Sequence, residues 1–344
     1  MSEETRPWVL AAARVFAAIM VVVLVLWPMA ASASAATVVP VGRAVGIKLF
    51  SDGVVVVGTS EIVTADGKSN PARECGLRAG DIITHINSTE VDTIEEVSAL
   101  LQELEGEEMC ISAIREDRKV MLTAQAVFCP GDNTYKLGAW IRDSMAGIGT
   151  VTFYCPDTGA FGALGHGIND LDTALLMPLE SGTILAASVS GVQKGQIGAP
   201  GQLKGTFKLD STLGELTANT AEGVFGTMSN TDWFAGQTME TAQRNEVKAG
   251  NATILSNING ESVEEYTIRI LKVYPASASE GGRDFLIQVT DQRLLDTTGG
   301  IVQGMSGSPI MQNGKVVGAV THVMVDDPTT GYGIWIGNML EAAG

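Results

Sequence analysis

The sequence predicts a mainly β protein that follows an N-terminal membrane segment, and three observations support this fold class. The 344 residues include 40 glycines but only nine phenylalanines and five tryptophans, which is typical of short strands joined by many turns. Hydrophobic residues make up 45% and charged residues 18%, so there is enough apolar side chain for folded cores. The third observation is a long apolar run close to the N-terminus. The length leaves room for roughly two domains.

Residues 1–36 are expected to form a signal or transmembrane segment. The stretch from Val9 to Met29 is interrupted only by Arg14 and is long enough to span a bilayer. The small residues of Ala30–Ala36 then resemble a signal-peptide cleavage region. A cleaved signal peptide and a retained anchor both fit this pattern. In either case the positively charged flank stays inside and the remainder is exported.

Charge and cysteine content exclude several classes of function. The net charge is −17 and no run of Lys and Arg is present, so we expect no nucleic-acid partner. The chain has no Cys-x-x-Cys pair and no His-Glu-x-x-His string, so we expect no metal and no cofactor. The cysteines are too few for a disulfide scaffold. Either all are free thiols or Cys110 pairs with Cys129 after export, and Cys75 and Cys155 stay unpaired.

The region 37–130 is predicted to be a compact unit of strands around one helix. Strands are expected at 45–49 and 54–57. Thr93 and Glu96 form a capping box that opens a helix through about Leu104, with apolar residues on one face. Charged residues 116–119 mark a turn between two further strands.

A glycine-rich segment in this unit resembles a PDZ domain of the bacterial protease type. The segment is Gly-Leu-Arg-Ala-Gly-Asp-Ile-Ile, residues 76–83, followed by Ile86-Asn87. PDZ domains bind a peptide as an added strand, so the resemblance implies a ligand beside Gly46, Ile47, Lys48 and Leu49, opposite the helix. The loop 42–46 would then offer backbone N–H groups to a terminal carboxylate. His85 is expected to be structural.

The region 131–344 contains many short strands at near-regular spacing, separated by glycine turns. This pattern predicts an all-β barrel or sandwich. Near its end, Gly304-Met305-Ser306-Gly307-Ser308-Pro309 resembles the nucleophile loop of chymotrypsin-like serine proteases, which implies a double β-barrel. A tight glycine turn would present the Ser306 hydroxyl and direct the N–H groups of Gly304 and Ser306 at one point, as an oxyanion hole requires. The same string, taken alone, also fits a plain β-turn.

A serine nucleophile needs a base and, usually, an orienting carboxylate. His166 lies between two glycines, which let its ring approach another loop, and we expect it to be the base. His322, on a strand after the serine loop, is the alternative. The spacing from His166 favours Asp210 as the acid. The wider set of candidate carboxylates is Asp170, Asp172, Asp210, Asp284, Asp291 and Asp296.

Together these features resemble the SpoIVB peptidases, the stage IV sporulation protein B family of endospore-forming bacteria. The resemblance rests on the N-terminal segment, the PDZ-like unit, Leu-Gly-His-Gly-Ile at 164–168 and the run from Thr298 to Ile334. It implies that Ser306 is the nucleophile, His166 the base and Asp291 the acid, whereas spacing favours Asp210.

The family resemblance also implies a biological role. It implies a membrane-anchored serine endopeptidase, exported between the mother-cell and forespore membranes, that cleaves itself near its N-terminus. Its protein substrate would be the membrane-anchored regulator of an intramembrane metalloprotease, whose release activates processing of a sigma factor. Two alternatives are a non-catalytic PDZ scaffold and a general PDZ-bearing quality-control protease.

Overall fold

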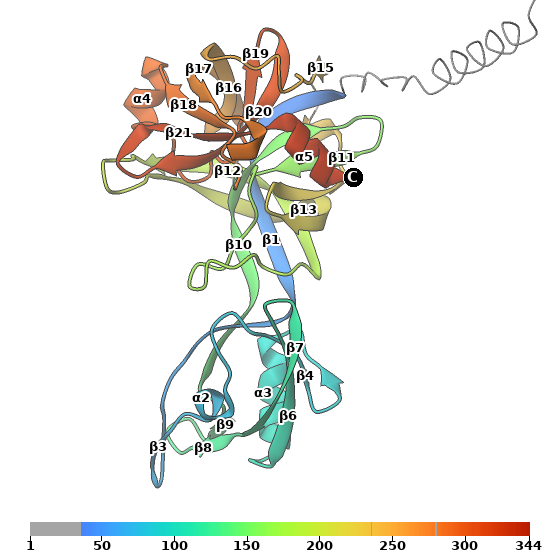
Figure 1. Cartoon of the computed structure of the whole chain (residues 1–344), viewed down its shortest axis with the longest axis vertical. Helices are drawn as coiled ribbons and strands as arrows, with labels where there is room; N and C mark the ends of the chain where they lie inside the picture. Colours follow the sequence, from blue (N-terminus) through green and yellow to red (C-terminus); the bar gives the residue numbers. More distant parts are fainter. Residues whose placement is uncertain (1–35, 235, 279–280) are drawn as a thin grey trace, which may run out of the picture. The chain divides into compact units, whose positions relative to one another are not determined.

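The computed structural model describes residues 36–344 apart from 235 and 279–280 (Figure 1). The predicted membrane segment therefore lies outside the described residues, except for Ala36. Among the residues that are described, no helix is long and apolar enough to cross a bilayer. Strands form most of the described chain, as the sequence predicts.

Two long strands pair antiparallel and run through both halves of the described chain. They are β1 (Thr37–Thr59) and β10 (Ala139–Tyr154), and their pairing extends from Val39 opposite Tyr154 to Thr59 opposite Ala139 (Figure 1). Most apolar side chains of β1 are buried, because neighbouring strands and cores cover both of its faces. Between Pro40 and Arg43 the pairing with β10 is interrupted by a bulge, at which Gly42 has φ +68°.

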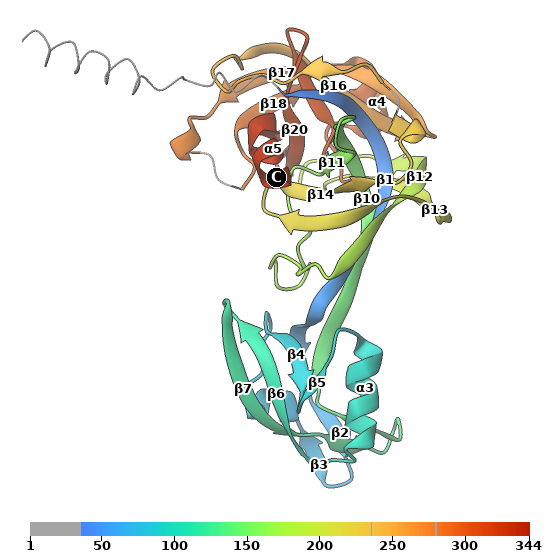
Figure 2. The ribbon, with the colours of Figure 1, turned by 90° about the vertical axis from the view of Figure 1, so that its right-hand side faces the viewer.

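The PDZ-like unit is built on the second half of β1. Its sheet continues from β1 to β4 (Ile82–Ile86), β6 (Glu108–Arg115) and β7 (Arg118–Gln125) (Figure 2). Its helices are α2 (Pro71–Cys75) and α3 (Ile94–Glu103). The short strands are β2 (Ile62–Thr64), β3 (Gly67–Ser69), β5 (Thr89–Glu90), β8 (Val127–Cys129) and β9 (Thr134–Lys136).

The predicted capping box and helix are confirmed. Thr93 accepts a hydrogen bond from the Glu96 N–H, and the Glu96 carboxylate accepts one from the Thr93 N–H. The helix that follows buries Val97 and Leu101 in the core of the PDZ-like unit. All four cysteines are free thiols in the structure.

The first half of β1 belongs to a ring of strands in the peptidase half. The ring runs β1-β12-β13-β14-β11-β10 and closes through the pairing of β10 with β1. Its further members are β11 (Ala160–Ala163), β12 (Ser181–Gln193), β13 (Gln202–Thr220) and β14 (Gly223–Met228). The first half of β1 precedes the PDZ-like unit in sequence, yet it packs its side chains into the core of this ring.

A second, closed barrel follows in sequence. Its strands are β16 (Gly250–Asn259), β17 (Ser262–Val273), β18 (Phe285–Val289), β19 (Pro309–Gln312), β20 (Lys315–Met324) and β21 (Asp327–Trp335). The remaining elements are β15 (Met239–Glu240), α4 (Gln292–Thr298), α5 (Ile336–Ala343) and single turns of 3₁₀-helix at Asp232–Phe234 and Ala276–Ala278.

The predicted PDZ ligand site at Gly46, Ile47, Lys48 and Leu49 is not compatible with these pairings. On one side of β1, Ile47 lies opposite Gly147 of β10, and on the other side it lies opposite Ile184 of β12. A peptide can add only to a free edge, and this segment is paired on both sides. The loop expected at 42–46 is likewise part of the strand.

Candidate active site

One cavity brings together the serine and both histidines of the peptidase half. It has a volume of about 500 Å³, and Ser306, His166 and His322 all line it. The two histidines come from different barrels, because His166 follows β11 and His322 lies on β20. The structure therefore places the predicted nucleophile and the predicted base in one open cavity, although 140 residues separate them in the sequence.

The serine loop is the tight glycine turn that the sequence predicts. Gly304 has φ +98° and Gly307 has φ +97°, a backbone conformation that favours glycine. The turn closes through hydrogen bonds from Met305 N–H to the Val302 carbonyl and from Ser308 N–H to the Met305 carbonyl. A Cβ atom on Gly307 would lie 2.0 Å from the Thr150 carbonyl oxygen, so only glycine fits at this position.

Thr150 of β10 fixes the serine loop from outside. Its hydroxyl donates to the Gly304 carbonyl at 2.7 Å, and its N–H donates to the Ser306 carbonyl at 3.1 Å. These bonds occupy the carbonyl oxygens of both residues predicted to form the oxyanion hole. Within the described part of the chain, the Gly304 and Ser306 N–H groups make no hydrogen bond, so both are free to donate to a substrate oxygen. Sequence reasoning missed Thr150, because this contact spans 154 residues and has no local motif.

The Ser306 hydroxyl is engaged with the backbone in this structure. It donates a hydrogen bond of 2.7 Å to the carbonyl oxygen of Thr321, the residue before His322. A hydroxyl carries one proton, so this bond competes with donation to a histidine. The serine must rotate away from Thr321 before a base can remove its proton.

The ring of His166 has the tautomer that a general base needs. Its Nδ1 atom lies 2.8 Å from the Gly167 carbonyl oxygen. A carbonyl only accepts hydrogen bonds, so Nδ1 carries the proton and Nε2 is left with a lone pair. Burial lowers the pKa of His166 below its usual 6.5, which keeps the ring neutral at pH 7.

The glycines around His166 allow the close approach that the sequence predicts. Gly165 has φ +71°, and a Cβ atom there would lie 2.9 Å from the Thr321 side chain. The histidine loop of the first ring therefore packs directly against β20 of the second barrel. Gly167 is equally confined, because a Cβ atom there would lie 2.2 Å from the Leu176 side chain.

His322 shares the cavity as a second neutral imidazole. The ring centroids of His166 and His322 are 5.1 Å apart. Burial, the neighbouring His166 and the charge of Arg283 lower the pKa of His322 to about 4. Its Nδ1 atom is buried and has no hydrogen-bond partner among the described residues.

The two acids proposed from the sequence lie elsewhere. Asp291 is the N-cap of α4, where its carboxylate accepts from Arg293 at 3.0 Å and from the Thr267 N–H at 3.3 Å. The guanidinium of Arg293 lowers the pKa of Asp291, which keeps it ionised. Asp210 is an exposed residue of β13. Neither residue lines the cavity of Ser306, and the position that an acid would take on His166 Nδ1 is filled by the Gly167 carbonyl.

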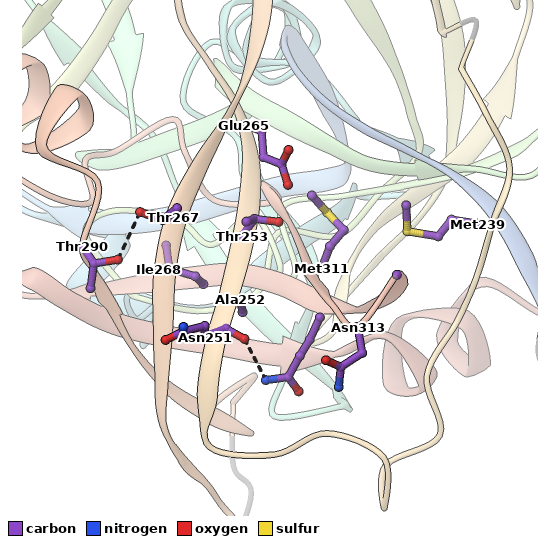
Figure 3. Close-up of a pocket in the computed structure, with 12 residues that line it drawn as sticks. Met239, Asn251, Ala252, Thr253, Glu265, Thr267, Ile268, Thr290, Met311 and Asn313 are labelled. Atoms are coloured by element: carbon purple, nitrogen blue, oxygen red, sulfur yellow. Dashed lines mark hydrogen bonds between the residues drawn. The ribbon is translucent and has the colours of Figure 1, made fainter.

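A second cavity, of about 540 Å³, lies on the closed barrel (Figure 3). Its labelled residues are mainly Thr, Asn and Met side chains, and Thr290 donates to Thr267 across it at 3.2 Å. Glu265 is the one ionisable residue that lines it. The two cavities are similar in size, but they differ in their lining residues. Ser306 and His166 line the first cavity and not the second, so the first is the candidate active site.

A family model confirms what the site suggests. The model described as SpoIVB peptidase S55 matches residues 133–340, and a PDZ domain model matches residues 62–112. The first match covers more than half of the chain. This chain belongs to the SpoIVB peptidase S55 family. It is a serine peptidase with a PDZ domain, so the family predicted from the sequence is confirmed.

Other comparisons reach parts of the chain. Zinc metalloprotease RasP of Shouchella clausii is 35% identical over 79 residues, which are 23% of this chain and 18% of that protein. The PDZ domain of the SdrC-like protein Lmo2051 of Listeria monocytogenes aligns with 26% of this chain and 87% of its own, at 22% identity and a TM-score of 0.22. The Rv3671c protease of M. tuberculosis, in its inactive form, aligns with 58% of this chain and 85% of its own, at 15% identity and a TM-score of 0.32.

Proposed function

We propose that this S55 peptidase cleaves peptide bonds with Ser306 as nucleophile and His166 as general base. The observation that carries the proposal is the single cavity lined by a serine on a glycine turn and a neutral histidine whose Nε2 is free to accept a proton. The strand ring and the closed barrel, one on the histidine side and one on the serine side, fit the double β-barrel implied by the chymotrypsin-like loop.

The reaction follows from these positions. Ser306 leaves the Thr321 carbonyl, gives its proton to His166 Nε2, and its oxygen bonds to the substrate carbonyl carbon. The Gly304 and Ser306 N–H groups donate to the oxygen that becomes negative. His166 then protonates the leaving amine as the C–N bond breaks. Water then gives a proton to His166 while its oxygen bonds to the ester carbonyl carbon, and His166 returns that proton to the Ser306 oxygen as the acyl–oxygen bond breaks.

The acid of this site is proposed on the family resemblance, which implies Asp291. For Asp291 to orient His166, its carboxylate would have to leave Arg293 and Thr267. The Gly167 carbonyl already holds the required tautomer, so the pair of Ser306 and His166 is complete without a carboxylate in the conformation described.

The experiment that tests the peptidase assignment is labelling of the full chain with a fluorophosphonate, a reagent that reacts with activated serines. The expected result is a covalent adduct on Ser306 that is lost in Ser306→Ala. Ser308→Ala is the matched control, because Ser308 lies in the same loop but is buried and bonded to Ser256. An unlabelled wild-type chain, or equal labelling of Ser306→Ala, would reject the assignment.

We also propose the role implied by family membership, a signalling endopeptidase of sporulation. In this proposal the N-terminal segment anchors the chain in a membrane, the peptidase lies between the mother-cell and forespore membranes, and it cuts itself and the regulator of an intramembrane protease. Support comes from the family and from the limited similarity to RasP, which is itself named a metalloprotease.

The signalling role differs from general quality control in substrate range. A signalling peptidase is expected to cleave its own N-terminal region or one partner ectodomain and to leave unfolded casein intact. Rapid and complete digestion of casein, with no discrete cleavage of the chain itself, would instead indicate a quality-control protease.

A further inference from the structure

The outer edge of β10, on the side away from β1, is unpaired over most of its length. β11 covers this edge only from Val151 to Tyr154. Within the part of the chain that the structure describes, residues 139–149 pair with β1 on one side and with no strand on the other. A free strand edge presents a row of N–H and C=O groups that another extended chain can pair with.

The hydrogen bonds of Thr150 show which groups point to this edge. Its N–H donates to the Ser306 carbonyl and its C=O accepts from the Leu164 N–H, both on the side away from β1. The pairing with β1 is unbroken from Val151 back to Ser144. Because backbone groups alternate along a strand, Ile148, Ala146 and Ser144 direct their N–H and C=O groups to the same outer edge.

One end of the free edge lies in the catalytic cavity. Residues 145–148 line this cavity together with Ser306 and His166. Ala146 and Gly147 are exposed, and a Cβ atom built on Gly147 would meet nothing within 4 Å. A strand paired here would pass through the cavity that holds the nucleophile.

The other end of the free edge lies beside α3 of the PDZ domain. Ala139 and Ile141 of β10 pack on the same core as Leu100 and Leu104 at the C-terminal end of α3. The N-terminal end of α3 is tied to the same strand, because the Ile94 N–H donates to the Asp143 carboxylate at 3.0 Å. PDZ domains bind an extended peptide at a sheet edge. Next to α3, the described chain offers the edges of β9 and β10, because the position expected on β1 is internal. In β9, the N–H and C=O of Tyr135 are already bonded to the Gln102 side chain of α3, so the edge of β10 is the one left for a peptide.

We propose that an extended segment of the protein substrate adds as a strand to the outer edge of β10, from Ala139 to Ile148. One continuous segment of about ten residues, at about 3.3 Å each, is then held by the PDZ domain and presented to Ser306. This inference rests on the proposed function of the site. The occupant is an unfolded polypeptide with apolar side chains, because the cavity beside the strand is lined by apolar residues that include Ile168, Leu171 and Val323.

Substrate length is the first test. The probes are two fluorogenic peptides with blocked ends, both built on a sequence that the full chain cleaves in a random-peptide library. One carries three residues on each side of the cleaved bond and the other carries ten. The expected kcat/KM is at least about tenfold higher for the long peptide, which corresponds to about 1.4 kcal/mol of added binding. Equal kcat/KM values for the two peptides would overturn the proposal.

A proline at the free edge is the second test. Ala146→Pro removes an N–H that points away from β1, so the pairing with β1 stays intact, as edge strands tolerate. Ala146→Ser is the matched control because it keeps the N–H. The expected result is a KM for the long peptide at least about tenfold higher in Ala146→Pro than in Ala146→Ser. The same KM in both variants would contradict strand addition.

Hydrogen exchange separates this inference from the catalytic assignment. In Ser306→Ala the long peptide is expected to protect the backbone amides of 139–143 and 144–149, and the short peptide only those of 144–149. This readout needs no cleavage, so it decides the binding edge even if Ser306 is inert. Protection of the β7 edge instead, or no protection on β10 by a bound peptide, would overturn the proposal.

Discussion

At the scale of single residues, the site depends on backbone carbonyls that hold side chains in place. The Gly167 carbonyl sets the tautomer of His166, and the Thr321 carbonyl holds the Ser306 hydroxyl. Thr150 in turn fixes the carbonyl groups of the serine loop. Such contacts depend on the fold and not on the identity of the neighbouring side chain, so no sequence motif predicts them.

Replacing Thr150 by valine tests its role in holding the loop. Thr150→Val removes the hydrogen bond to the Gly304 carbonyl, and a displaced oxyanion donor is expected to lower kcat about 10- to 100-fold. The control is Thr152→Val on the same strand, where the buried hydroxyl has no partner among the described residues. Thr152→Val is expected to keep kcat and stability. Steady-state kinetics measure this effect. Equal kcat values for the two variants would contradict a role of Thr150 in holding the serine loop.

The pH dependence of kcat/KM tests the state of His166. Burial lowers its pKa below 6.5, and the base must be neutral to accept a proton, so activity is expected to persist below pH 6.5 and to fall only at lower pH. An acid limb with an apparent pKa above 6.5 in the free enzyme would contradict a buried neutral base.

The same shift has a consequence for stability. Between pH 6.5 and about 4, the unfolded chain binds a proton at His322 that the folded chain does not bind, and the lowered pKa of His166 acts in the same direction below pH 6.5. The free energy of unfolding is therefore expected to decrease as the pH falls through this window. His322→Gln should weaken that decrease in denaturant titrations at pH 7 and pH 5, while the acid limb assigned to His166 stays.

At the scale of elements, local sequence signals predict α3 and the serine turn, but they do not predict which strands pair with β1. The capping box of Thr93 and Glu96 and the glycines 304 and 307 act within a few residues, so the sequence alone reveals them. The partners of β1 in β10 and β12 lie about 80 to 140 residues downstream. An internal strand and an edge strand have the same local sequence pattern, so the sequence could not show that residues 46–49 of β1 are paired on both sides.

Asp291 is the residue for which the sequence and the contacts give different roles. As N-cap of α4 and partner of Arg293, it is expected to stabilise this element, and Asp291→Ala should lower the free energy of unfolding by about 1 kcal/mol. Thermal or denaturant unfolding measures this effect. If the folded variant keeps a kcat within about tenfold of the wild type, Asp291 does not orient His166, and the Gly167 carbonyl alone does so. A fall of several orders of magnitude would support the acid role that the family implies.

At the scale of the whole molecule, the PDZ domain and the peptidase are joined by shared strands. The first half of β1 completes the strand ring beside the catalytic cavity, and its second half starts the PDZ sheet. The family, the mainly β fold and the serine and histidine could be predicted from motifs. The sharing of β1 and β10 could not, because it depends on which strands meet in space.

The central claim is that Ser306 and His166 act as one unit, and a double-mutant comparison of kcat tests it most directly. The full chain is compared with Ser306→Ala, His166→Gln and the double variant on one cleaved fluorogenic peptide, after circular dichroism has shown that all four are folded. Each single variant is expected to lose several orders of magnitude in kcat, and the double variant is expected to lose no more than the worse single one. Losses that multiply in the double variant, or a Ser306→Ala variant that keeps its activity, would contradict the claim.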